Sequence, residues 1–197
     1  MKHRQVPLPS PLLRRGLHLE YATLAWNIVG VWVLAWAALS ARSVALGGFG
    51  LDSLIEIGAS SVVIWELASS GPGRENRALR LIGAAFVLLA AYLLVQSTVV
   101  LVAGHHARHS PPGIAWTAVT AAVMFSLAWG KARTGKALGN PVLQTEGRVT
   151  FVDGILATAV LAGLVLNAAV GWWWADPVAG YVLVFYAARE ARAIFSP

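Results

Sequence analysis

Long apolar stretches, separated by short polar or turn-forming segments, make up most of the chain. Six of them have the length of about 20 residues that a helix needs to cross the hydrocarbon core of a bilayer. They cover residues 17–39, 44–68, 78–103, 113–130, 141–170 and 174–195. Turn-forming runs lie at Ser70-Gly-Pro-Gly73 and at Ser110-Pro-Pro-Gly113. The pattern predicts an all-α polytopic membrane protein, with one domain of six transmembrane helices over residues 17–197.

The composition agrees with a membrane protein. Of the 197 residues, 57% are hydrophobic and only 12% are charged, whereas soluble domains average about 25% charged residues. The mean hydropathy is +0.65. The chain has no Cys, which excludes disulfides and thiolate metal sites. Residues 1–16 are basic and lack the apolar core of a signal peptide, so we expect a short cytoplasmic tail.

Basic residues concentrate on one side of the predicted bundle. Only Arg42 and Arg108 fall in connections on the other side. The remaining Lys and Arg residues are Lys2, Arg4, Arg14, Arg15, Arg74, Arg77, Arg80, Lys131, Arg133, Lys136, Arg148, Arg189 and Arg192. The positive-inside rule then places both termini in the cytoplasm. The net charge of +6 therefore indicates basic loops that face anionic lipid, and we expect no binding of nucleic acid.

Three acidic residues interrupt the apolar stretches. Asp52 and Glu56 are four residues apart and thus share one helix face, and Asp153 lies in the fifth stretch. A helix that begins at Pro141 would place Asp153 about 18 Å along its axis, close to the depth of Glu56. Acidic residues inside a membrane are costly, and they commonly mark the path of an ion or a proton.

A cation site explains these acids better than a buried ion pair. No Lys or Arg falls inside the predicted stretches at matching depth, so we expect Asp52, Glu56 and Asp153 to bind a divalent cation or protons. Carboxylates bind metal when deprotonated, and neighbouring carboxylates in a low dielectric resist ionising together. We therefore expect metal to exchange for protons. The chain lacks nucleotide-binding and catalytic motifs, so we expect no nucleotide, no resident cofactor and no enzymatic activity.

The other acids lie nearer to the ends of the stretches. We interpret Glu20, Glu66, Glu75, Asp176 and Glu190 as solvated surface charges. Glu146 has two interpretations, since it could be a surface charge paired with Arg148 or a residue that receives an incoming cation. His105, His106 and His109 lie in an outer loop, where they form either a solvated loop or a weak metal-collecting site.

The stretch Gly50-Leu-Asp-Ser-Leu-Ile-Glu-Ile-Gly-Ala-Ser60 resembles the second transmembrane helix of the cation diffusion facilitator family. That family has six spans and both termini inside, and its second helix carries two metal ligands four residues apart, matching Asp52 and Glu56. Its fifth helix carries two more ligands at this spacing. Asp153 matches the second of these, whereas the first, usually His or Asp, falls on Val149, which cannot bind a metal. The run Trp174-Ala-Asp-Pro177 is similar to the start of the family's sixth helix.

The resemblance implies a proton-coupled exporter of divalent cations, with Zn²⁺ as the first candidate and Mn²⁺, Fe²⁺, Co²⁺ and Cd²⁺ as others. Asp52, Glu56 and Asp153 would be the ligands, and Glu146 or Thr150 could replace the ligand missing at Val149. The family's cytoplasmic metal-binding domain is expected to be absent, and a homodimer would then be held by membrane helices. The composition suggests a bacterial inner membrane. A non-transporting metal sensor or a partner subunit of a heteromeric transporter is the alternative, and an intramembrane hydrolase is a weaker one.

Overall fold

The computed structural model describes residues 11–68 and 74–196, with the side chains at 66–68, 74–79, 81, 82 and 85 excepted. This part of the chain forms six helices. They are α1 (Pro11–Ala41), α2 (Val44–Ala68), α3 (Arg74–Ala103), α4 (Pro111–Leu138), α5 (Pro141–Val170) and α6 (Ala175–Phe195). The prediction of an all-α membrane bundle is confirmed. Most of the predicted tail at 1–16 and the turn at 70–73 lie outside the described residues.

The main difference from the predicted elements is the length of α4. This helix continues from residue 130 to Leu138, through the basic run that we placed in a loop. Lys and Arg are good helix formers and do not end a helix by themselves. The helix ends instead at Gly139, whose left-handed conformation with φ 63° is a common C-terminal cap. Lys131 consequently lies inside a helix.

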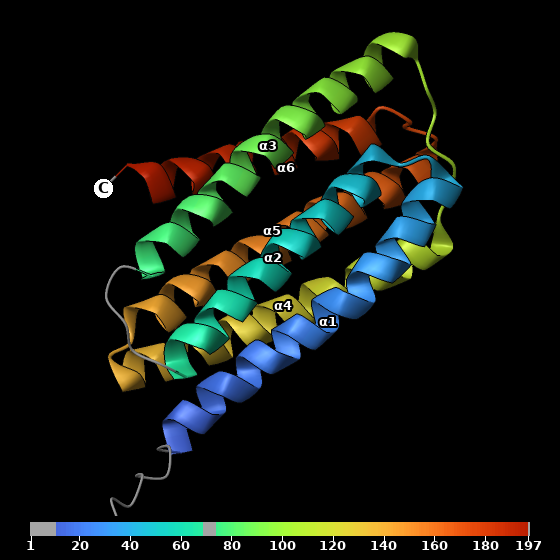
Figure 1. Cartoon of the computed structure of the whole chain (residues 1–197). Coiled ribbons are helices and arrows are strands. Elements are labelled where there is room, and N and C mark those ends of the chain that lie inside the picture. Colours follow the sequence, from blue (N-terminus) through green and yellow to red (C-terminus); the bar gives the residue numbers. More distant parts are fainter. Residues whose placement is uncertain (1–10, 69–73, 197) are drawn as a thin grey trace, which may run out of the picture.

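The helices alternate in direction, so that both ends of the described chain lie at one end of the bundle (Figure 1). We call this the basic end, since it carries most of the Arg and Lys residues. Helices α1, α2, α4 and α5 pack together as a four-helix unit, and α3 packs mainly on α6 as a pair beside it. The pair contacts the unit through α2 and α5.

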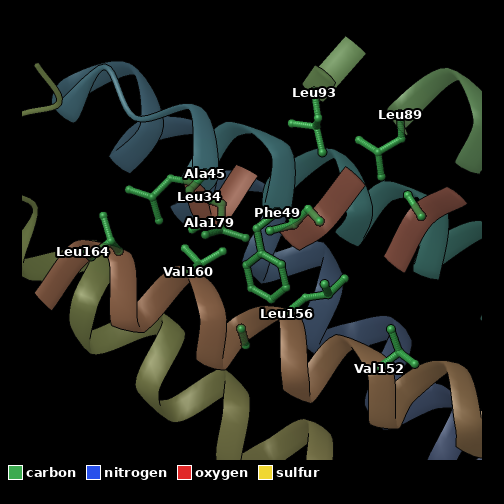
Figure 2. Packing of buried hydrophobic residues seen from close by; sticks show 14 of the residues in the cluster. Leu34, Ala45, Phe49, Leu89, Leu93, Val152, Leu156, Val160, Leu164 and Ala179 are labelled. Carbon is green, nitrogen blue, oxygen red and sulfur yellow. The ribbon is translucent and has the colours of Figure 1, made fainter. Parts of the chain in front are cut away.

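An apolar core joins the unit to the pair. Phe49 of α2 lies beside Leu156 of α5, and Leu93 of α3 packs above α2 (Figure 2). Small residues bring α4 and α5 into backbone contact, because a Cβ atom added at Gly147 would lie 2.9 Å from the backbone nitrogen of Ala132. This close approach lets side chains of α4 and α5 meet directly.

The exterior of the bundle is apolar. Trp32, Leu39 and Leu88 are 76%, 82% and 72% exposed, which suits contact with lipid. By length and composition, the described helices α1 to α5 are able to cross a membrane. The last turns of α6 carry Arg189, Glu190 and Arg192, so that α6 as the sixth span remains a prediction.

Asp176 joins the starts of α6 and α2. It is buried, and its carboxylate accepts hydrogen bonds from the Ser43 hydroxyl and from the backbone nitrogens of Val44 and Ala45, the latter two at 2.9 and 3.4 Å. It thus caps the N-terminus of α2 from another helix. Our interpretation of Asp176 as a surface charge is wrong, because the sequence does not reveal that these two helix starts meet.

We expect Asp176→Ala to destabilise the protein by about 1–3 kcal/mol, since it leaves buried N–H donors at the start of α2 without an acceptor. Asp176→Asn keeps an acceptor oxygen and should cost less. Thermal unfolding in detergent would measure both changes, with the half-buried Glu190→Ala as the control. An unchanged midpoint for Asp176→Ala would show that this contact does not stabilise the fold.

Candidate ion-binding site

The three acids that we singled out come together between α2 and α5. Asp52 and Glu56 lie on one face of α2 and are 3% and 4% exposed, and Asp153 on α5 is 5% exposed. The Asp153 side chain interacts with both Asp52 and Glu56. These three carboxyl groups lie close enough for their charges to act on one another, and we call these three residues the acid row.

The acid row is not a closed coordination cage. In the part of the chain that the structure describes, no group of three or more His, Cys, Asp or Glu residues is arranged to hold a metal ion. The Oδ2 atom of Asp153 is buried and accepts no hydrogen bond from a described residue. A metal ion bound here would have to draw the carboxylates of α2 and α5 toward a common centre.

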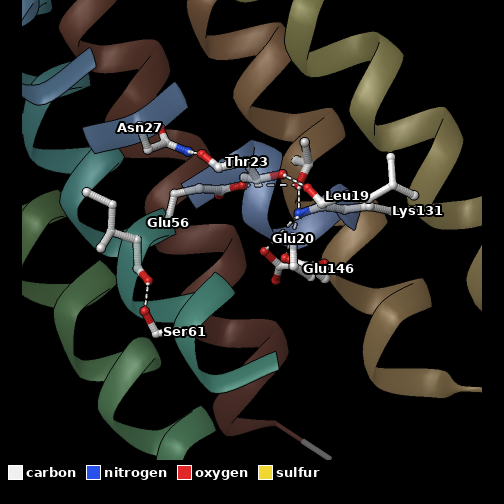
Figure 3. A network of polar contacts seen from close by, with 10 residues as sticks. Leu19, Glu20, Thr23, Asn27, Glu56, Ser61, Lys131 and Glu146 are labelled. Carbon is white, nitrogen blue, oxygen red and sulfur yellow. Dashed lines mark hydrogen bonds and ion pairs between the residues drawn. The ribbon is translucent and has the colours of Figure 1, made fainter. Parts of the chain in front are cut away.

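Lys131 lies inside the bundle, contrary to our expectation that no basic residue does so at this depth. Its side chain is fully buried, and its Nζ atom lies 3.1 Å from Glu20 Oε2 and 3.3 Å from Glu146 Oε1 (Figure 3). It also donates a hydrogen bond to Thr150 Oγ1 at 3.0 Å. We call these four residues the lysine cluster. Sequence reasoning missed Lys131 because the basic run at the end of α4 resembled a loop.

Two of our interpretations of acidic residues are therefore wrong. Glu20 is fully buried in α1 and is not a surface charge. Glu146 is 5% exposed and pairs with Lys131, whereas Arg148 donates to Thr145 Oγ1 at 3.0 Å. The reading of Glu146 as a residue that receives an incoming cation stays a prediction. Glu190 is half-buried, and the side chains of Glu66 and Glu75 lie outside the described residues.

Thr150 connects the lysine cluster to the acid row. Its hydroxyl accepts the hydrogen bond from Lys131 and donates one to Glu56 Oε1 at 3.0 Å. A continuous line of polar groups thus runs from Glu146 to the acid row. Along it, five buried carboxyl groups share one buried ammonium group. Because uncompensated charge is very costly in a low dielectric, such an assembly requires further cations or protons.

A cavity of about 820 Å³ lies beside α5 at the basic end. Glu146 and Val149 line it from α5, and Arg189 and Glu190 line it from α6. Val149 is half-buried and stands one helical turn before Asp153. The cavity therefore reaches the lysine cluster. It also reaches Val149, the position at which the family that the sequence resembles carries a fourth ligand.

The histidines of the connection between α3 and α4 do not take part in this assembly. His105, His106 and His109 are exposed in the connection between α3 and α4, at the opposite end of the bundle from Glu146. His106 stacks on Trp173 with ring centroids 4.8 Å apart. The structure thus separates these imidazoles from the acid row, and a metal-collecting role in the loop stays a prediction.

A known protein family matches almost the whole bundle. The family model described as the cation efflux transmembrane domain matches residues 21–197. No curated protein matches the chain. The matched range contains the acid row, Lys131, Glu146 and Thr150, whereas Glu20 directly precedes it.

Proposed function

Since the chain belongs to the cation efflux family, a family of membrane transporters of cations, we propose that it carries a divalent metal cation through the acid row. The observation that supports this most is the meeting of three buried carboxyl groups from α2 and α5. Among the described residues, none of the three forms an ion pair with Lys or Arg. Oxygen ligands of this kind suit hard and borderline divalent ions.

Zn²⁺ is the first candidate for the transported ion, followed by Mn²⁺, Fe²⁺, Co²⁺ and Cd²⁺. A donor set of carboxylates without imidazole supports keeping Mn²⁺ and Fe²⁺ beside Zn²⁺. Metal and protons compete for the same oxygens, since carboxylates bind metal in their deprotonated form. Metal from the basic, cytoplasmic end would displace protons, and protons from the other side would release the metal during alternating access.

We also propose a homodimer held by membrane helices, which the family resemblance implies, in a bacterial inner membrane, which the composition suggests. A non-transporting sensor or the partner subunit of a heteromeric transporter is the second candidate. Val149 favours it, because this residue removes one ligand position of the resembling family. The two candidates differ in whether the purified chain moves metal by itself.

The test is metal flux into proteoliposomes that contain only this chain. We expect uptake of Zn²⁺ or Mn²⁺ that increases when a pH gradient supplies protons on the side where metal is released. Asp52→Asn should abolish this flux, whereas Lys136→Met, an exposed position on α4, should not. No flux of any of the five candidate metals in folded protein would overturn the transport proposal. Flux that does not depend on the pH gradient would overturn the proposal of proton exchange but not that of transport.

A further inference from the structure

We propose that Glu20, Glu146 and Thr150 form a second cation site, where the Lys131 ammonium group holds the place of a divalent ion until an ion displaces it. The proposal rests on the proposed function, because it puts this site on the route to the acid row. It assigns a role to the four residues of the lysine cluster, of which only Lys131 is basic.

The first support is the surroundings of the Lys131 ammonium group. Three oxygens lie 3.0–3.3 Å from Nζ, two from carboxylates and one from a hydroxyl. This set matches the donors that oxygen-preferring divalent ions use. An ammonium group has three N–H donors, so Lys131 occupies this oxygen set as a cation would.

The second support is the incomplete compensation of Glu20. This side chain is fully buried, and its Oε1 atom accepts no hydrogen bond of normal geometry from a described residue, although the buried Ser60 hydroxyl lies nearby. The cluster also contains two carboxyl groups for one ammonium group. A divalent ion bound in place of Lys131 would offer Glu20 and Glu146 the charge that a single ammonium group does not.

The third support is the position of the cluster between the cavity and the acid row. Glu146 lines the cavity at the basic end, and Thr150 hydrogen-bonds to Glu56 of the acid row. Glu146 and Asp153 are two helical turns apart, about 10 Å along α5. Of the lysine cluster and the acid row, Glu146 is the residue that lines the cavity, so an ion that enters from it meets a carboxyl group of the lysine cluster first.

The flexible four-carbon stem of Lys131 allows its ammonium group to move aside and to return. A tethered group acts at an effective concentration of roughly millimolar or higher, so Lys131 competes with any ion for this site. Removing its charge should expose the site to metal. Lys131 would thus set the concentration of metal at which ions begin to enter.

The test is Mn²⁺ binding, measured by titration calorimetry on the full chain in detergent. The starting protein carries Asp52→Asn and Asp153→Asn, which disable the acid row. Adding Lys131→Met should create tight binding of one Mn²⁺ per chain, with an affinity increased by about tenfold or more. Further change of Glu20 and Glu146 to Gln should remove this binding. Lys136→Met removes one charge from the exposed side of α4 and should have no effect.

The proposal is overturned if the folded Lys131→Met protein binds no additional Mn²⁺. Lys131→Gln, which can still form hydrogen bonds, replaces it if the Met variant does not fold. In the wild-type background, Glu20→Gln and Glu146→Gln should raise the KM of Mn²⁺ flux more than they lower kcat, whereas Lys136→Met should not. An unchanged KM in both variants would also overturn the proposal.

The binding experiment separates this inference from the proposed function. A gain of Mn²⁺ binding in the Lys131 variants without any flux in the wild type would retain the second site and reject transport. Flux that depends on the acid row, with no gain of binding, would retain transport and reject the second site.

Discussion

Asp153→Asn is expected to lower metal flux by about 100-fold or more while leaving the protein folded. Asp153 is the member of the acid row on α5, and Asp52 and Glu56 both act on it, so its carboxylate is the one that links the ligands of α2 to α5. The amide keeps the volume of the side chain but removes its charge. Changing a residue that only hydrogen-bonds to a metal ligand already lowers metal affinity or activity by about 10- to 100-fold. Initial rates of Zn²⁺ and Mn²⁺ flux at equal protein density measure the effect.

Glu190→Gln is the matched control for this loss of charge. Glu190 is half-buried at the cavity. Its change removes the same charge outside the acid row, where Glu190 acts on Asp52 only weakly and through space. We expect it to retain flux. Normal flux in Asp153→Asn would remove this residue from the site. Equal losses in both variants would indicate a general effect of charge at the basic end.

Val149→His is expected to shift selectivity toward Zn²⁺ over Mn²⁺ by about tenfold, because imidazole suits Zn²⁺ better than Mn²⁺. Val149 stands one turn before Asp153 on α5 and lines the cavity, so that an imidazole has room there. A His at this position would also restore the ligand that the family usually carries there. Competition between the two metals, measured as flux and as binding, would give the ratio.

Val149→Leu is the control, since it adds volume without a metal ligand. It should leave the ratio of the two metals unchanged. If Leu shifts the ratio as much as His, the effect comes from the shape of the cavity and not from coordination. If neither variant changes it, the side chain at 149 does not reach the transported ion.

The helices and the acid row could be predicted from local patterns in the sequence. Long apolar stretches predict α2 and α5 over the residues that the structure has. The four-residue spacing of Asp52 and Glu56 places them on one face, and a helix start at Pro141 puts Asp153 near their depth. Each of these inferences needs only the geometry of a single helix.

Lys131, Glu20 and Asp176 could not be placed in the same way. Each lies near the end of an apolar stretch, where a charged residue is equally compatible with solvent or with the bundle interior. Their burial depends on which helices pack together, and on the extension of α4 beyond residue 130. Hydrophobic periodicity indicates which face of a helix is buried, but not which helix packs against that face. The lysine cluster could therefore be identified only from the fold.

The Asp176 contact restricts how the helices of such a transporter can move. It ties α6 to the start of α2 at the end opposite the cavity. There, Asn167 also donates to the carbonyl of Ala107 at 2.9 Å, and the backbone nitrogen of Arg108 donates to the carbonyl of Ala41 at 2.7 Å. No hydrogen bond or close ion pair joins described residues of α5 and α6 across the cavity, where Arg148 and Glu190 attract each other only at longer range. A rotation of the α3–α6 pair would therefore have its pivot at Asp176, and its largest displacement beside Glu146.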